Sequence, residues 1–97
     1  MNKRTLESWH QLQQELKIGD VVTGTVFQVE AYGSYVDIGK DFYGIVLAPH
    51  ISDKPGLEFH EYPQVGETIS SRILDFSEYT NPDQIPFNYI SLSIKHL

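Results

Sequence analysis

Two tyrosines flank a Gly-Ser pair near the middle of the chain, at Tyr32 and Tyr35. From residue 34 to residue 38 polar and apolar residues alternate with a period of two, which is typical of a half-buried strand. This phase directs Tyr35 and Asp37 to solvent and the residues between and beside them to a core. Exposed aromatic rings that lie close together form a surface on which nucleobases stack. The segment therefore predicts a binding site for single-stranded nucleic acid.

Other residue types that carry chemistry form no catalytic or metal-binding motif. The chain has no Cys, which excludes disulfides, thiolate zinc sites and cysteine nucleophiles. The nearest approaches to a metal motif, residues 50–53 and His60-Glu61, lack two ligands at helical spacing. There is no Gly-Lys-Ser/Thr phosphate loop and no Gly-X-Ser-X-Gly turn. We therefore expect a protein that is not an enzyme, with no catalytic residues, no metal and no cofactor.

A helix is predicted over residues 5–17, ahead of the tyrosines. Thr5 is a suitable N-cap, and Gly19 is a suitable residue to follow the helix. The apolar residues of the segment share one face; they are Leu6, Trp9, Leu12 and Leu16. This face either packs on the rest of the domain or docks a partner protein, and the sequence leaves both readings open.

Five strands are predicted after the helix, over residues 20–30, 34–38, 42–47, 67–76 and 87–94. An irregular stretch, residues 48–66, with one helical turn near residues 50–53, separates the third strand from the fourth. Short strands with internal glycines and a long link after the third strand indicate an all-β fold, a five-stranded OB-fold barrel. We accordingly divide the chain into an N-terminal helical extension, residues 1–17, and an OB-fold domain, residues 18–97.

The charge of the chain does not favour nucleic acid. Its 97 residues suggest one domain, and they carry a net charge of -6. Residues 1–19 hold three cations and two acids, for +1, whereas residues 20–97 hold four cations and 11 acids, for -7. Proteins that bind nucleic acid non-specifically usually carry basic patches. The acidic barrel therefore supports an alternative function in protein–protein interaction.

The sequence gives no sign of membrane insertion or export. No apolar run approaches the roughly 20 residues that span a bilayer. The basic start of the chain is not followed by the apolar block of a signal peptide. We therefore expect a cytoplasmic protein that does not contact a membrane.

Five segments, in order between residues 17 and 95, resemble the S1 RNA-binding domain family. Residues 17–26 (KIGDVVTGTV) resemble its opening, and residues 32–39 (YGSYVDIG) its aromatic-Gly-small-aromatic-Val stretch. Residues 43–46 (YGIV) match the family's third strand. Residues 65–67 and 72–76 match its fourth strand, and residues 90–95 (ISLSIK) match its last. The resemblance implies an OB barrel that binds single-stranded RNA.

The family's typical RNA platform has two aromatics around the second-strand Gly and a His at the end of the third strand. Tyr32 and Tyr35 match the aromatic pair. The family reads Gly-Leu-Val-His-Ile-Ser, whereas residues 44–52 here read GIVLAPHIS. Counting from the Gly puts Leu47 at the His position, and aligning the Ile-Ser pair puts His50 there. His50 is thus a candidate contact, with an ordinary loop His as the alternative.

Three further residues are candidates for the platform. Arg72 faces outward by alternation on the fourth strand, and Lys40 lies in the turn between the second and third strands. Either could contact phosphate or be a solvated charge. Tyr89 and Ser77 stand where the family often has charged residues, and Tyr89 could add a stacking ring or pack in the core.

These observations predict a small stand-alone protein that binds single-stranded RNA weakly, by stacking on the second and third strands. The RNA would be ribosomal or messenger. The alternative is an acidic interaction module that docks a protein through residues 5–17 or residues 48–66 and binds little or no RNA.

Overall fold

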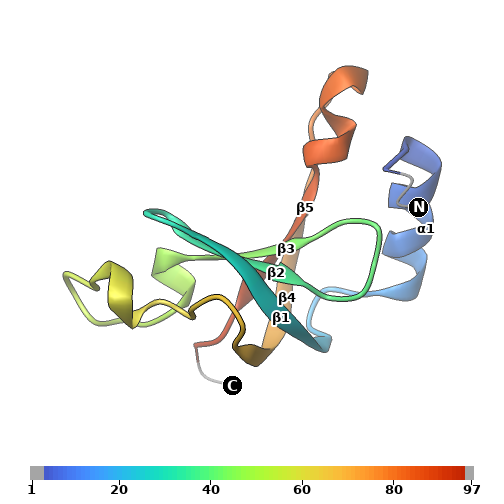
Figure 1. The fold of residues 1–97 in the computed structure, drawn as a ribbon. Coiled ribbons are helices and arrows are strands. Elements are labelled where there is room, and N and C mark those ends of the chain that lie inside the picture. The colour runs from blue at the N-terminus through green and yellow to red at the C-terminus, as the bar shows by residue number, and fades with distance from the viewer. Residues whose placement is uncertain (1–3, 96–97) are drawn as a thin grey trace.

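One helix precedes five strands that close into a barrel in residues 4–95, which the computed structural model describes (Figure 1). The elements are α1 (Leu6–Glu15), β1 (Val21–Glu30), β2 (Gly33–Asp37), β3 (Gly44–Leu47), β4 (Thr68–Ser77) and β5 (Tyr89–Ser93). Three 3-10 turns lie in the connections: η1 (Ala48–His50), η2 (Phe59–Glu61) and η3 (Pro82–Phe87). The expected five-stranded OB-fold barrel with an N-terminal helix is confirmed. Within these residues no helix is long and apolar enough to cross a membrane.

The strand order around the barrel is β1-β2-β3-β5-β4. All neighbours are antiparallel except β3 and β5, which are parallel. Strand β1 takes part in two pairings along its length: residues 21–25 pair with β4, and residues 25–30 pair with β2. The second half of β1 therefore lies beside β2 and β3, and the first half lies beside β4.

Helix α1 packs on the barrel through its apolar face. Trp9 is fully buried, and its ring meets the rings of Phe42 at 4.8 Å and Phe76 at 5.9 Å between centroids. The indole Nε1 donates a hydrogen bond of 3.1 Å to Oε1 of Glu78. Thr5 caps the helix as predicted, because its side chain accepts from the backbone N–H of Ser8. The apolar face of α1 thus packs against the core of the barrel. The division of the chain at residue 17 stays a prediction. Residues 1–3 and 96–97 lie outside the described residues.

Several predicted bounds are wrong by two residues. The helix ends at Glu15, because Leu16 adopts an extended backbone with φ -115° and ψ 141°. Strand β3 begins at Gly44 instead of residue 42, because residues 41–42 form a bend whose Phe42 turns into the core. Strand β5 begins at Tyr89 instead of residue 87, because Phe87 belongs to η3. The helical turn predicted near residues 50–53 is η1, two residues earlier.

Gly33 fixes where β2 begins, between the two tyrosines. A Cβ atom at this position would overlap the carbonyl oxygen of Val46 on β3. The next residue, Ser34, is fully buried, and its hydroxyl donates a 2.8 Å hydrogen bond to the carbonyl oxygen of Pro63. The predicted phase of the strand is confirmed, since Val36 is fully buried while Asp37 is exposed.

Candidate nucleic-acid interface

Four aromatic rings gather on the outside of the barrel, over β1, β2 and the start of β3. Tyr35 lies at the centre, with ring centroids 6.0 Å from Tyr32, 5.2 Å from Tyr43 and 6.0 Å from Phe27. Phe27 and Tyr43 are 6.1 Å apart, and all four contacts are edge-to-face. Tyr32 is 50% exposed and Phe27 is 45% exposed. We call these four residues the aromatic face.

A β-bulge in β1 turns Phe27 towards the tyrosines. Val26 pairs with Val36 and Gln28 pairs with Tyr35, so Phe27 is the extra residue between two ladder pairs. A bulge of this kind bends the strand and re-aims a side chain. Val26 points into the core, whereas Phe27 and Gln28 are both exposed. The second half of β1 therefore presents a large apolar ring to solvent next to β2.

Backbone hydrogen bonds fix the main chain at Tyr32 and Tyr43, the two tyrosines that contact the central Tyr35. The carbonyl oxygen of Tyr32 accepts from the N–H of Ala48 at 2.9 Å, which ties the β1–β2 turn to the end of β3. The carbonyl oxygen of Tyr43 accepts from the N–H of Ile90 at 3.0 Å, which ties the start of β3 to β5. Tyr35 itself pairs with Ile45 of β3. The rings of the face are thus carried by a paired, closed sheet.

Two tyrosines of the aromatic face, Tyr35 and Tyr43, have raised pKa values. Burial raises the pKa of Tyr35, and a hydrogen bond between its hydroxyl and that of Tyr32 raises it further. Burial also raises the pKa of Tyr43, although the nearby Arg4 charge opposes the shift. These rings therefore stay neutral near pH 7 and add no negative charge to an already acidic protein.

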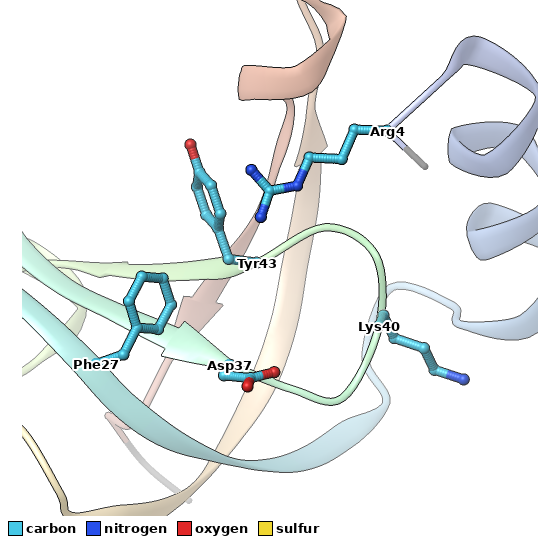
Figure 2. Close-up of a pocket in the computed structure, with 5 residues that line it drawn as sticks. All are labelled: Arg4, Phe27, Asp37, Lys40 and Tyr43. Carbon is cyan, nitrogen blue, oxygen red and sulfur yellow. The ribbon is translucent and has the colours of Figure 1, made fainter. Parts of the chain in front are cut away.

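A small pocket of about 200 Å³ lies at one end of the aromatic face (Figure 2). It is lined by Arg4, Phe27, Asp37, Lys40 and Tyr43. The guanidinium carbon of Arg4 lies 5.3 Å from the centre of the Tyr43 ring, and its Nε donates a 2.8 Å hydrogen bond to the carbonyl oxygen of Asp41. In residues 4–95 no three His, Asp or Glu side chains are grouped closely enough to hold a metal ion.

The structure places two of the other predicted residues away from the centre of the face. The Lys40 ammonium forms a 3.0 Å ion pair with Glu15 of α1, and Figure 2 shows it pointing away from Phe27 and Tyr43. Arg72 donates a 2.8 Å hydrogen bond to the carbonyl oxygen of Gly19. It pairs with Val21, six residues before Phe27 on β1, so about 20 Å of strand separates it from the face.

The structure places Tyr89 close to Tyr43 of the aromatic face and His50 at the end of η1, which follows β3. Tyr89 directly precedes Ile90, whose N–H binds the carbonyl oxygen of Tyr43, so β5 brings Tyr89 beside the face. The Tyr89 and Tyr79 hydroxyls contribute to the raised pKa of Tyr43. His50 ends η1, and its carbonyl oxygen accepts from the N–H of Ile94 at 3.0 Å. The role of the His50 side chain stays a prediction.

Sequence reasoning missed three members of this site. The sequence could have indicated that Phe27 faces outward, because side chains alternate along a strand and the neighbouring Val26 is predicted to face the core. Tyr43 directly precedes the buried Gly44, so alternation on the third strand also indicates its direction. Arg4 had no such signal, because its contact with residue 41 spans 37 positions of sequence.

The sequence is similar to an RNA-binding domain family and to ribosomal proteins. The model of the S1 RNA binding domain family matches residues 15–84. The small ribosomal subunit protein bS1 homolog of Bacillus subtilis is 34% identical over 89 residues, which cover 92% of this chain and 22% of that protein. The small ribosomal subunit protein bS1 of Helicobacter pylori is 37% identical over 75 residues, which cover 75% of this chain and 14% of that protein. The chain thus spans less than a quarter of these relatives.

A solved structure gives the same fold. The solution structure of GSP13 from Bacillus subtilis has a TM-score of 0.65 and 25% identity, over 82% of this chain and 56% of that chain. The five-stranded closed barrel, the order of the motifs along it and the family match point to one assignment. Because the match covers more than half of the described sequence, the chain belongs to the S1 RNA-binding domain family.

Proposed function

We propose that the protein binds single-stranded RNA by stacking bases on the aromatic face. The family is of an RNA-binding, ribosomal-protein type and is not a family of enzymes. The observation that carries the proposal is the contiguity of the four rings, two of which are about half exposed: Phe27 at 45% and Tyr32 at 50%. Stacking on aromatic side chains tolerates any base, because every base has a π-face. Ribosomal or messenger RNA is the natural class of ligand.

The affinity of this site is weak and depends little on salt. Each stacked base contributes about 1–3 kcal/mol, and the net charge of -6 opposes the approach of phosphates. Lys40 is already paired with Glu15, and Arg72 lies far from the face. Few cations are therefore available to replace the counterions of RNA, so the slope of log K against log salt is shallow.

A direct test is fluorescence anisotropy with a labelled ten-nucleotide oligouridine at low salt. Tyr35→Ala removes the central ring and is expected to lower the affinity about tenfold, in line with about 1–3 kcal/mol per stacked base. Phe59→Ala is the matched control, because Phe59 is an aromatic residue that is 51% exposed in η2, outside the face. We expect this control to bind like the wild type.

Two results would contradict the proposal. One is an anisotropy that does not change with protein concentration at low salt, which would leave the wild type without RNA binding. The other is an equal loss of affinity in Tyr35→Ala and Phe59→Ala, which would place the RNA elsewhere on the surface.

A second candidate is a protein partner that docks on helix α1. The apolar face of α1 is buried, yet Leu6 at its start is 49% exposed and borders a shallow groove with His10 and Gln14. The acidic balance of residues 20–97 also suits a basic partner protein better than RNA. Affinity capture from nuclease-treated lysate tests this candidate. One stoichiometric protein that is lost with Leu6→Gln supports it, whereas recovery of RNA alone contradicts it.

A further inference from the structure

We propose that the pocket at the end of the aromatic face holds a guanine base of the RNA, read by Arg4 and Asp37. This inference rests on the proposed function, since it names the base that one part of the RNA-binding surface prefers. Arg4 precedes the family match of residues 15–84, so the pocket is completed by a segment that the shared domain does not include.

The size and walls of the pocket suit one base. Its volume of about 200 Å³ is below the roughly 300–1,000 Å³ of pockets that enclose drug-sized molecules. Phe27 forms one wall, and its ring is 45% exposed, which leaves a surface for stacking. The Arg4 guanidinium lies over the Tyr43 ring, and both groups line the pocket together with Phe27 (Figure 2).

The charges of the pocket favour a base over a phosphate. Three charged side chains line the pocket, Arg4, Lys40 and Asp37, and Lys40 is already paired with Glu15. A phosphate would meet the carboxylate of Asp37, which is exposed at the end of β2. Figure 2 shows the Arg4 guanidinium near the Tyr43 ring and the Asp37 carboxylate on the opposite side of the pocket. Among residues 4–95 the ion pairs within 4.0 Å include neither of these two groups. A guanidinium donor and a carboxylate acceptor therefore line the same pocket.

Guanine is the base whose edges match this pair. Its O6 and N7 atoms accept two hydrogen bonds from an arginine, the commonest specific contact of arginine with a base. Its N1–H and N2 amino groups donate to a carboxylate. Adenine has a donor beside N7 where guanine has O6, so adenine cannot accept the same pair of bonds from Arg4.

Both side chains keep free hydrogen-bonding atoms while they hold their positions. Arg4 uses Nε to bind the carbonyl oxygen of Asp41, which fixes the guanidinium and leaves its two terminal amino groups for a ligand. Asp37 uses Oδ1 to accept from the N–H of Gly39 at 2.9 Å, which leaves Oδ2 for a ligand. The turn and the strand thus pre-position the two groups.

The test compares labelled seven-nucleotide RNAs that differ only at the central base, in an oligouridine background at low salt. The central base is guanine, inosine, 7-deazaguanine, adenine or uracil. We expect guanine to bind about tenfold more tightly than adenine or uracil, which is within the discrimination of one bidentate contact. Inosine, without the N2 amino group, and 7-deazaguanine, without N7, should each bind with intermediate affinity.

Two variants test which side chain contacts which atoms of the guanine base. Asp37→Asn keeps the oxygen that accepts from Gly39, so the turn is retained, and it should abolish the difference between guanine and inosine. Arg4→Gln should abolish the difference between guanine and 7-deazaguanine. Arg72→Gln is the charge-matched control for Arg4, because Arg72 lies on β4 and binds Gly19. This control should retain the preference for guanine.

The outcomes separate this inference from the proposed function. Equal affinity for all five RNAs, together with a loss of affinity in Tyr35→Ala, would overturn the guanine pocket and leave RNA binding intact. A guanine preference that survives in both Asp37→Asn and Arg4→Gln would also overturn the pocket. The absence of binding to every RNA would overturn the proposed function itself.

Discussion

The protein contains two aromatic clusters of similar geometry and opposite exposure. In the inner cluster, Trp9 meets Phe42 at 4.8 Å and Phe76 at 5.9 Å, and Trp9 and Phe42 are 0% and 1% exposed. On the aromatic face the ring centroids are 5.2–6.1 Å apart, yet Phe27 and Tyr32 are about half exposed. Edge-to-face contacts are present in both. Ring geometry therefore does not tell a folding cluster from a binding surface, whereas exposure does.

Adjacent residues of the chain contribute to the two clusters at positions 42 and 43. Phe42 turns into the core, and its neighbour Tyr43 turns out to the face. The N-terminal segment contributes to both clusters, because Trp9 fills the core while Arg4 covers Tyr43. The N-terminal segment that packs on the barrel thus also supplies the cation of the proposed guanine pocket.

The largest expected difference between the two clusters is in stability, and Trp9→Ala is the variant expected to lose most. Removing a fully buried indole from the inner cluster is expected to lower the free energy of unfolding by about 3–5 kcal/mol. Tyr32→Ala, which removes a half-exposed ring from the aromatic face, is expected to cost well under that amount. Urea unfolding monitored by circular dichroism measures both. Equal losses in the two variants would show that the aromatic face is as structural as the inner cluster.

A smaller loss of stability is expected when the hydrogen bond between the Trp9 indole and Glu78 is removed. Glu78→Ala removes the acceptor of the Trp9 indole N–H, which then stays buried without a partner. The expected cost is about 1–3 kcal/mol of unfolding free energy. Glu78→Gln keeps an acceptor oxygen and should retain most of that stability. A Glu78→Ala variant as stable as the wild type would contradict this account of how the indole is satisfied.

The smallest effect concerns the protons of the aromatic face. The pKa values of Tyr35 and Tyr43 are raised in the folded state, chiefly by burial, above the unfolded value of 10.0. The folded chain therefore keeps these protons when the unfolded chain loses them, so the stability is full below pH 10 and falls as the pH rises above it. Urea unfolding between pH 9 and pH 11 should show this decline, and Tyr35→Phe with Tyr43→Phe should flatten it. An equal decline in the double variant would refute the assignment.

The sequence predicted the parts of the molecule in which local periodicity determines which side chains face the core. The period-two pattern of residues 34–38 predicted the inward Val36 and the outward Tyr35. The apolar stripe of the helix identified the face that carries Trp9, but the sequence left open whether this face packs on the domain or docks a partner. Bounds were less accurate where a tertiary contact overrides the pattern, as at Phe42. The bulge at Phe27 depends on the register in which β1 pairs with β2, and the contact of Arg4 with Tyr43 joins segments that are far apart in the sequence. No local pattern encodes the position of Arg4.

The central claim is that RNA contacts the outer aromatic cluster and leaves the inner one untouched. Chemical shifts of the aromatic side chains, measured by NMR while the labelled protein is titrated with a seven-nucleotide RNA, test this claim most directly. We expect the signals of Phe27, Tyr32, Tyr35 and Tyr43 to shift progressively and saturate, while those of Trp9, Phe42 and Phe76 stay unchanged. Unchanged shifts on the aromatic face, or shifts confined to another surface, would contradict it.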